Sequence, residues 1–179
     1  MSKPKNRPVV TEPAETRTLT LLRHAKSSWK DSALPDVDRP LNKRGRREAD
    51  AMAARIVDFG GSFATVFASP ARRTRETLAR MLMQLPAQDA AIVFDSSLYT
   101  FERDSLLDAL KTLDDSLQEV MVVGHNPAMQ ETIEWLTGAR LDRFPTAACA
   151  QLSVPVAHWV ALDAGCAELD WVLEPDWKS

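Results

Sequence analysis

The segment Leu19–Trp29, LTLLRHAKSSW, begins as an apolar run and ends abruptly in charged and polar residues. Its first residues have the composition of a short buried strand. Arg23 and His24 stand where that strand would end, and His24 is one of only three histidines in the chain. In an open α/β sheet, ligands bind beyond the carboxyl ends of the strands. The segment therefore predicts a functional group at the end of a buried strand.

The rest of the chain alternates between helical spacing and short apolar runs that resemble strands apolar on both faces. This alternation is typical of a parallel sheet covered by helices on both sides. The last two apolar runs, 147–156 and 167–175, are joined without a helix and favour an antiparallel edge. We expect an α/β fold, a three-layer α/β/α sandwich with a mainly parallel sheet. The predicted helices span 41–59, 69–85, 104–113 and 127–138. Besides the first strand and the last two, the predicted strands span 63–68, 90–95 and 119–124.

Two of the predicted helices carry apparent capping residues. Ser69 is the predicted N-cap of the helix in 69–85, with Pro70 at its first position, a place where proline is favoured. Asp104 or Ser105 is the predicted N-cap of the helix that follows the third strand.

The bulk properties predict one ordinary domain. The chain has 179 residues, of which 45% are hydrophobic and 26% charged, and its net charge is −3. A single domain over 17–179 and a flexible, proline-containing tail over 1–16 are expected. The net charge gives no general attraction for nucleic acid or an anionic membrane, and no apolar run reaches the length of a membrane span. With only Cys149 and Cys166, a reduced, cytoplasmic setting is expected.

Three of the predicted strand ends carry chemically distinctive residues. The first ends in Arg23 and His24, the second is followed by Ser-Pro and three arginines within 69–75, and the fourth ends in Gly-His-Asn-Pro at 124–127. Arginine forks match phosphate oxygens, and helix N-termini add N–H donors. The arginines would repel a divalent cation, and the histidines lack metal-ligand spacing. The pattern therefore favours a phosphoryl group and predicts no metal or cofactor.

The four motifs together are similar to those of a known family. The chain resembles the histidine phosphatase superfamily, with its phosphoglycerate-mutase-like fold, and within it the SixA-type phosphohistidine phosphatases. The resemblance runs from about Leu19 to Leu136. It is carried by LLRHAKSSW at 21–29, DRPLNKRGRREA at 38–49, ASPARRTRET at 68–77 and VVGHNP at 122–127.

The resemblance implies a role for four residues of one phosphate pocket. His24 matches the nucleophile that becomes phosphorylated, and Arg23 beside it matches the first phosphate clamp. In the Ser-Pro-x-x-Arg pattern the matching arginine is Arg73, whereas Arg72 and Arg75 are expected to face solvent. His125 of Gly-His-Asn-Pro matches the second pocket histidine. Neighbouring positive charge should lower the pKa of His24, whereas a bound phosphate dianion should raise it.

The sequence offers more than one candidate for the general acid that protonates the leaving group. The region LYTFERDSLL at 98–107 offers Glu102 or Asp104. Asp104 matches the acidic position of the SixA-type subgroup better, but a structural role as a helix N-cap explains it equally well. The prediction therefore includes Asp104 as a catalytic residue and keeps Glu102, or no residue, as alternatives.

The predicted function is a metal-independent phosphatase that works through a phosphohistidine intermediate. The stretch between the second predicted helix and the fourth predicted strand leaves little material for the long lid of larger relatives. An open pocket that accepts phosphohistidine or another phosphorylated protein side chain is therefore expected. Arg39 and Lys43 would border the pocket and attract an acidic partner, with Trp29 nearby, whereas His158 is expected to be structural. The alternatives are a small-molecule phosphomonoesterase and a non-catalytic module that binds a phosphorylated ligand.

Overall fold

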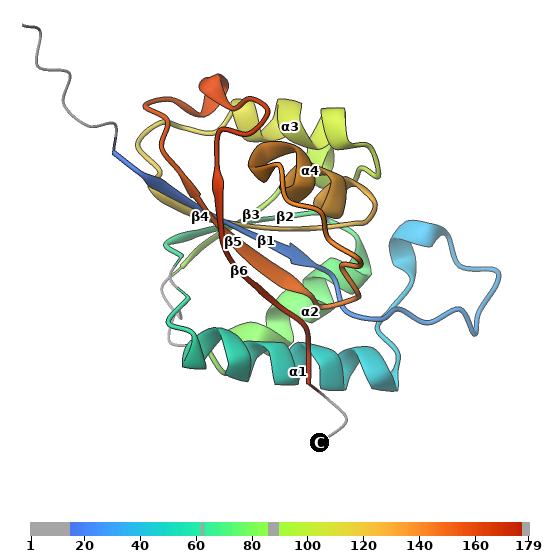
Figure 1. The fold of residues 1–179 in the computed structure, drawn as a ribbon. Helices are drawn as coiled ribbons and strands as arrows, with labels where there is room; N and C mark the ends of the chain where they lie inside the picture. The colour runs from blue at the N-terminus through green and yellow to red at the C-terminus, as the bar shows by residue number, and fades with distance from the viewer. Residues whose placement is uncertain (1–14, 62, 86–89, 177–179) are drawn as a thin grey trace, which may run out of the picture.

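The apolar run that opens the chain forms strand β1 (Arg17–Arg23), inside a six-stranded sheet of order β3-β2-β4-β1-β5-β6 (Figure 1). The computed structural model describes residues 15–61, 63–85 and 90–176. Of the predicted N-terminal tail, residues 1–14 lie outside the described residues. The other strands are β2 (Thr65–Ala68), β3 (Ala91–Phe94), β4 (Glu119–Gly124), β5 (Cys149–Val154) and β6 (Glu168–Leu173).

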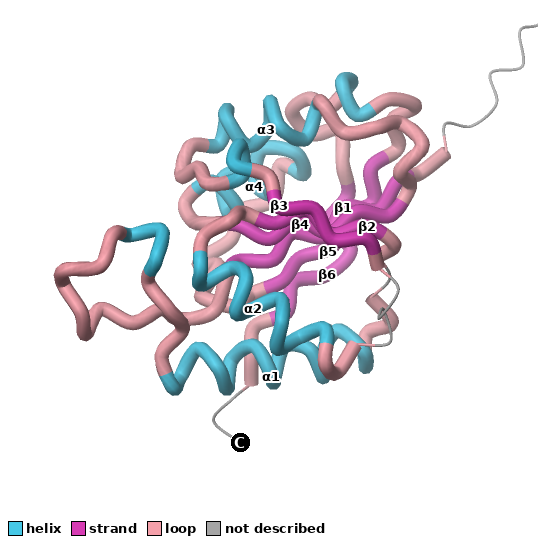
Figure 2. The backbone as a smooth tube through the Cα atoms, turned by 180° about the vertical axis from the view of Figure 1, so that it is seen from behind, coloured by secondary structure: helices cyan, strands magenta, loops and turns pink. Residues whose placement is uncertain are grey.

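The sheet is parallel over four strands and antiparallel at one side, as predicted. The pairs β1–β4, β2–β4 and β2–β3 are parallel, whereas β1–β5 and β5–β6 are antiparallel. Helices cover both faces, with α1 and α2 on one side and α3 and α4 on the other (Figures 1 and 2). The α/β/α sandwich is thus confirmed. The helices are α1 (Lys43–Asp58), α2 (Arg72–Leu82), α3 (Arg103–Lys111) and α4 (Ala128–Thr137).

Two hydrophobic clusters hold the three layers together. Leu19 and Leu21 of β1 pack with α3 and α4 residues such as Leu110 and Ile133. Leu22 packs on the opposite face, in the cluster that includes Ile56 of α1 and residues of α2. Because successive side chains of a strand point to opposite faces, β1 and β4 are buried from both sides. Strand β3 differs, since it lies at the edge and all four of its residues are exposed.

The helix N-caps differ from those predicted. Helix α2 has Ala71 at its N-cap and begins at Arg72, so the prediction of Ser69 is wrong. The Ser69 hydroxyl accepts a hydrogen bond from the Ala71 N–H and also contacts a histidine ring nitrogen, a tertiary role that the local sequence does not reveal. Helix α3 begins at Arg103 with Glu102 at its N-cap, and Asp104 lies inside the first turn.

A close backbone approach fixes the connection between β1 and α1. The Asn42 N–H donates to the Lys26 carbonyl, and the Asn42 side chain caps α1 by accepting from the Gly45 N–H. A Cβ at Gly45 would lie 2.0 Å from the Lys26 carbonyl oxygen, so only glycine permits this contact. The segment in between, 27–42, projects beyond the sheet at the carboxyl end of β1 (Figure 1). It includes the short 3-10 helix η1 (Asp36–Asp38).

Candidate active site

The ends of β1 and β4 bring two histidines together. Arg23 and Gly124 are register partners in the parallel β1–β4 pair, and the His24 N–H donates to the Gly124 carbonyl. A histidine directly follows each strand, so His24 and His125 lie at the same edge of the sheet. Their ring centroids are 5.0 Å apart and both residues are buried.

A buried arginine joins the two rings. Arg73, near the start of α2, is 1% exposed. Its Nε donates to His24 Nε2 at 3.3 Å, and its Nη2 lies 3.2 Å from His125 Nδ1. Arg72 and Arg75, on either side of Thr74 and Arg73, are exposed. Of the three arginines in this turn, Arg73 is therefore the one that points into the site.

Arg23 has a guanidinium nitrogen that makes no hydrogen bond within the described residues. Its Nη1 donates to the Phe144 carbonyl at 2.9 Å, but its Nε is buried and has no hydrogen-bond partner among the described residues. Burial lowers the pKa of Arg23, and the nearby Glu48 carboxylate opposes that effect. A buried guanidinium nitrogen without an acceptor is costly unless a ligand supplies one. The structure thus brings His24, Arg23, Arg73 and His125 to one place.

Hydrogen bonds assign the free ring nitrogens. His24 Nδ1 lies 2.7 Å from the Ala25 carbonyl, which can only accept, so Nδ1 carries the proton and Nε2 carries a lone pair. His125 Nδ1 accepts from Arg73, so its Nε2 donates to Ser69 Oγ at 2.8 Å. The pKa of His24 is lowered well below its usual value by burial and then by His125. The pKa of His125 is lowered to about 3, first by burial and then by Arg73.

A carboxylate from the segment 27–42 also reaches Arg73. Asp36 Oδ2 accepts from Arg73 Nη2 at 2.9 Å and from the Tyr99 hydroxyl at 2.6 Å, and Oδ1 accepts from Arg39. Burial alone would raise the pKa of Asp36, but hydrogen bonds from Tyr99, Arg39 and Arg73 hold it well below its usual value. The sequence analysis missed Asp36. The available signal was its i,i+3 spacing from Arg39.

Aromatic side chains form one wall beside His125. The Tyr99 ring meets His125 edge-on at 5.4 Å, and the Phe101 ring lies 5.2 Å from it. Trp29, predicted to be near the pocket, is 71% exposed and carries the Arg39 guanidinium 3.5 Å from its ring centroid. Trp29 is therefore linked to Arg73 through Arg39 and Asp36, at the outer side of the site.

Comparisons with known proteins identify the family of this chain. Residues 19–98 match the histidine phosphatase superfamily (branch 1). An uncharacterized chloroplastic protein of Arabidopsis thaliana is 32% identical over 169 residues, which cover 89% of this chain and 76% of that protein. The chain belongs to the histidine phosphatase superfamily.

Solved structures of this superfamily share the whole fold. A putative phosphohistidine phosphatase SixA from Nakamurella multipartitia is 30% identical, with a TM-score of 0.77 over 92% of this chain and 99% of that one. A putative SixA from Agrobacterium tumefaciens is 28% identical, with a TM-score of 0.75 over 89% of this chain and 98% of that one. This superfamily member therefore resembles SixA along most of its length.

The carboxylates predicted as general acids lie elsewhere. Asp104 is 79% exposed, and its carboxylate accepts two hydrogen bonds from its neighbour Arg103. Glu102 is exposed at the N-cap of α3. Neither is brought into contact with the two histidines, and the catalytic role of Asp104 stays a prediction. His158, expected to be structural, is exposed and paired with Asp115.

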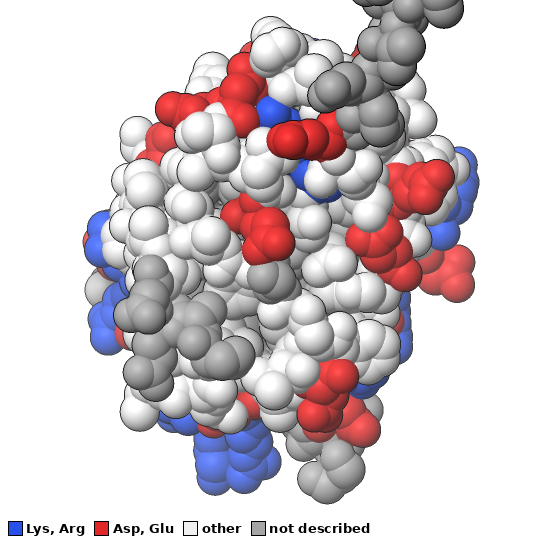
Figure 3. Space-filling model, turned by 90° about the vertical axis from the view of Figure 1, so that its left-hand side faces the viewer, with Lys and Arg blue, Asp and Glu red and all other residues white. Residues whose placement is uncertain are grey.

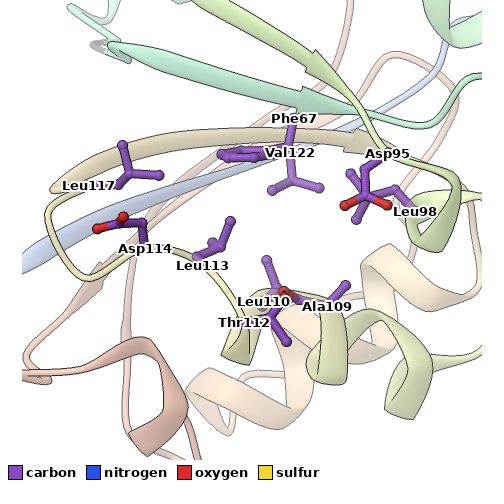
Figure 4. A pocket seen from close by; sticks show the side chains of 10 residues that line it. All are labelled: Phe67, Asp95, Leu98, Ala109, Leu110, Thr112, Leu113, Asp114, Leu117 and Val122. Carbon is purple, nitrogen blue, oxygen red and sulfur yellow. The ribbon is translucent and has the colours of Figure 1, made fainter.

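A separate cavity lies between α3 and the sheet (Figure 4). Its volume is about 220 Å³, and apolar side chains such as Phe67, Leu110 and Val122 point into it. Its only charged lining residues are Asp95 and Asp114, so it offers no cation for an anionic ligand. Within the described ranges, no group of three or more His, Cys, Asp or Glu is placed to bind a metal ion. No helix in the described part of the chain could cross a bilayer.

The lowered pKa of His125 predicts how stability depends on pH. An unfolded histidine takes up a proton near pH 6.5, whereas folded His125 stays neutral down to about pH 3. The unfolded state therefore binds more protons in this window, and the free energy of unfolding falls as the pH drops below 6.5. One such histidine accounts for about 2 kcal/mol between pH 7.5 and 5, at roughly 1.4 kcal/mol per pH unit.

His125→Gln should remove that contribution, because glutamine does not titrate. Urea unfolding of both proteins at pH 7.5 and 5 should show the natural chain losing about 2 kcal/mol more than the variant. Parallel losses in the two proteins would contradict a depressed pKa for His125.

Proposed function

We propose that this protein is a metal-independent phosphatase that transfers a phosphoryl group to His24 Nε2 and then to water. The observation that carries the proposal is the pair of unprotonated ring nitrogens, His24 Nε2 and His125 Nδ1, on one buried guanidinium of Arg73. The unpaired Nε of Arg23 adds a second guanidinium donor. Two guanidinium groups around a nucleophilic nitrogen match the charge of a transferring phosphoryl group.

The chemistry proceeds in two displacements. In the first, the lone pair of His24 Nε2 attacks phosphorus, and the bond from phosphorus to the leaving group breaks. In the second, water attacks phosphorus, the N–P bond breaks and inorganic phosphate leaves. The leaving group takes up one proton and the attacking water releases one, so protons balance over the cycle. Arg23 and Arg73 would stabilise the charge on the phosphoryl oxygens in both steps, and His125 would join them once its Nδ1 takes up a proton, which a bound phosphate dianion favours.

The proposed substrate is phosphohistidine or another phosphorylated side chain of a protein. The exposed aromatic groups at the site support an open pocket, since Phe101 is 41% exposed and Trp29 still more so. A phosphorylated side chain on a protein surface can reach such a pocket, whereas small substrates are better held by enclosed ones. The resemblance to putative SixA phosphohistidine phosphatases supports the same class.

Proton delivery to the leaving group by Asp104 would need a rearrangement of that side chain. Asp104 would have to leave its pair with Arg103 and move to the histidines. Asp36 already contacts Arg73, but its lowered pKa keeps it ionised and makes it a weak base, so it would act as a positioning group.

We also propose a cytoplasmic location for the protein, because Cys149 and Cys166 are both free thiols.

The test is to trap the phosphoenzyme. With p-nitrophenyl phosphate in excess EDTA, the protein should release nitrophenol, and a radiolabelled phosphohistidine peptide should leave label on the protein after an alkaline quench. The label should be lost in acid and map to the peptide that contains His24. A non-catalytic binding module would retain inorganic phosphate yet give no turnover and no label, which would overturn the proposal.

A small-molecule phosphomonoesterase is the alternative enzyme. Initial rates on a phosphohistidine peptide and on a set of sugar phosphates separate the two. A kcat/KM that is higher for any sugar phosphate than for the peptide would favour the alternative.

A further inference from the structure

A basic cleft lies beside the candidate active site. Its volume is about 570 Å³, and four of its eight lining residues are cationic: Lys30, Lys43, Arg44 and Arg46. The other four are uncharged, so the lining includes no acidic side chain. This concentration of positive charge occurs on a chain whose net charge is −3.

The positive charge of the cleft is only partly neutralised within the protein. Arg44 pairs with the buried carboxylate of Glu48, which also accepts from Thr146. Arg46 donates a hydrogen bond to the Leu41 carbonyl. Because that acceptor is neutral, the bond does not neutralise the charge of the Arg46 guanidinium. Lys30 and Lys43 are exposed and make no ion pair with any described residue. The cleft therefore presents net positive charge to a ligand.

The opposite end of the molecule has a different character. Figure 3 looks at the side where β1 begins, and there Asp and Glu are spread over the face while most Lys and Arg lie towards its margins. An acidic partner would therefore be repelled by this face and attracted to the basic cleft.

The segment 27–42 links the cleft to the active site. The Ser28 N–H donates to the Pro40 carbonyl, and both residues line the cleft. The next residue, Arg39, contacts Ser27 and Asp36, and Asp36 contacts Arg73. The cleft and the two histidines are therefore connected by contacts within one short segment of the chain.

We propose that this cleft binds an acidic segment of the phosphorylated protein substrate, adjacent to the phosphorylated side chain. The inference rests on the proposed function, because a phosphorylated side chain must occupy the histidine pocket. The cations are spread along an open cleft instead of converging on one point, which fits several carboxylates along a polypeptide better than a single second phosphate. The proposed partner is thus a protein surface rich in Asp and Glu on one side of its phosphorylated residue.

The test compares two synthetic phosphohistidine peptides that differ only beside the phosphorylated residue, where one has four glutamates and the other four glutamines. At low salt, the natural protein should prefer the glutamate peptide about 10-fold in kcat/KM, mainly through KM. The preference should shrink as salt is added, because exposed charge pairs are screened. Lys30→Glu combined with Arg46→Glu should abolish the preference and leave the rate on p-nitrophenyl phosphate unchanged, because neither residue belongs to the phosphate pocket.

A matched control makes the same change in net charge elsewhere. Lys111→Glu combined with Arg140→Glu alters residues outside the cleft lining and should keep the preference. If the cleft variant keeps the preference, or the control loses it equally, the inference is overturned. Competition by a single-stranded oligonucleotide that binds as tightly as the glutamate peptide would overturn it as well, because the occupant would then be a nucleic acid.

Failure of the proposed acidic-segment binding can be distinguished from failure of the proposed phosphatase function. A natural protein without turnover on any phosphorylated substrate would contradict the phosphatase proposal itself. Peptide binding can still be measured in that case by fluorescence anisotropy, with the glutamate and glutamine peptides and the same two double variants.

Discussion

Asparagine in place of His24 is expected to lower kcat/KM for p-nitrophenyl phosphate by roughly 10⁴- to 10⁶-fold, the range seen when a covalent nucleophile is removed. Asparagine has no ring nitrogen to take the place of Nε2, so the N–P bond cannot form. Its side chain is smaller and polar, so the buried site can accommodate it without a new charge. Steady-state rates in EDTA measure the effect, and the urea midpoint verifies that the variant is folded.

His158→Asn is the matched control. His158 is exposed and paired with Asp115, far along the chain from either pocket motif, so its replacement should leave the rate within about 2-fold of the original. Affinity for inorganic phosphate offers a second measurement. His24→Asn should retain most of it, because Arg23, Arg73 and His125 remain. An asparagine variant that turns over within 10-fold of the natural chain would contradict the assignment of His24 as nucleophile.

That His24, Arg23, Arg73 and His125 meet at one edge of the sheet could be predicted only in part from sheet geometry. Parallel strands have their carboxyl ends at one edge, so the residues that follow β1 and β4 must lie there, as must the start of α2. That β1 and β4 are neighbours depends on the strand order, which the sequence does not reveal. The choice of one arginine among the three of that turn comes from the family resemblance and not from geometry.

Asp36 could not be predicted by that rule. Its position depends on the path of the segment 27–42, which is fixed by tertiary contacts such as the Ser27–Leu41 bridge and the close approach of Gly45 to Lys26. The local sequence around Asp36 does not predict those tertiary contacts. The role of Ser69 could not be predicted from local sequence either. Its hydroxyl is suited to cap a helix, but the tertiary structure places it against His125. A side chain with two suitable roles takes the one that the tertiary structure provides.

The exposure of β3 has a similar cause. The run 90–95 has the apolar composition of a buried strand, yet sheet order places β3 at the edge, where its residues are only partly covered. Composition predicts that a segment is a strand more reliably than it predicts the strand's place in the sheet. That place depends on which strands pair, a property of the whole chain.

Replacement of Arg73 by lysine is expected to lower kcat/KM by roughly 10²- to 10⁴-fold, although the positive charge is kept. The planar guanidinium directs Nε to His24, Nη2 to His125 and Asp36, and Nη1 to the Asp36 carbonyl. A lysine has one nitrogen and cannot reach all of these acceptors together, so the charge would no longer be held across both histidines. Most of the loss should appear in kcat, because the guanidinium fork matters most when charge develops on the phosphoryl oxygens.

Arg72→Lys is the matched control, one residue earlier on the same helix. Arg72 is exposed and forms an i,i+4 pair with Glu76, which a lysine can also form, so the rate and the urea midpoint should stay close to those of the natural chain. Arg73→Lys should lower the midpoint as well, because Asp36 and the two imidazoles lose a buried partner. If lysine at 73 supported full turnover, a point charge would be sufficient at this position, and the fork geometry that joins the two histidines would have no part in the reaction.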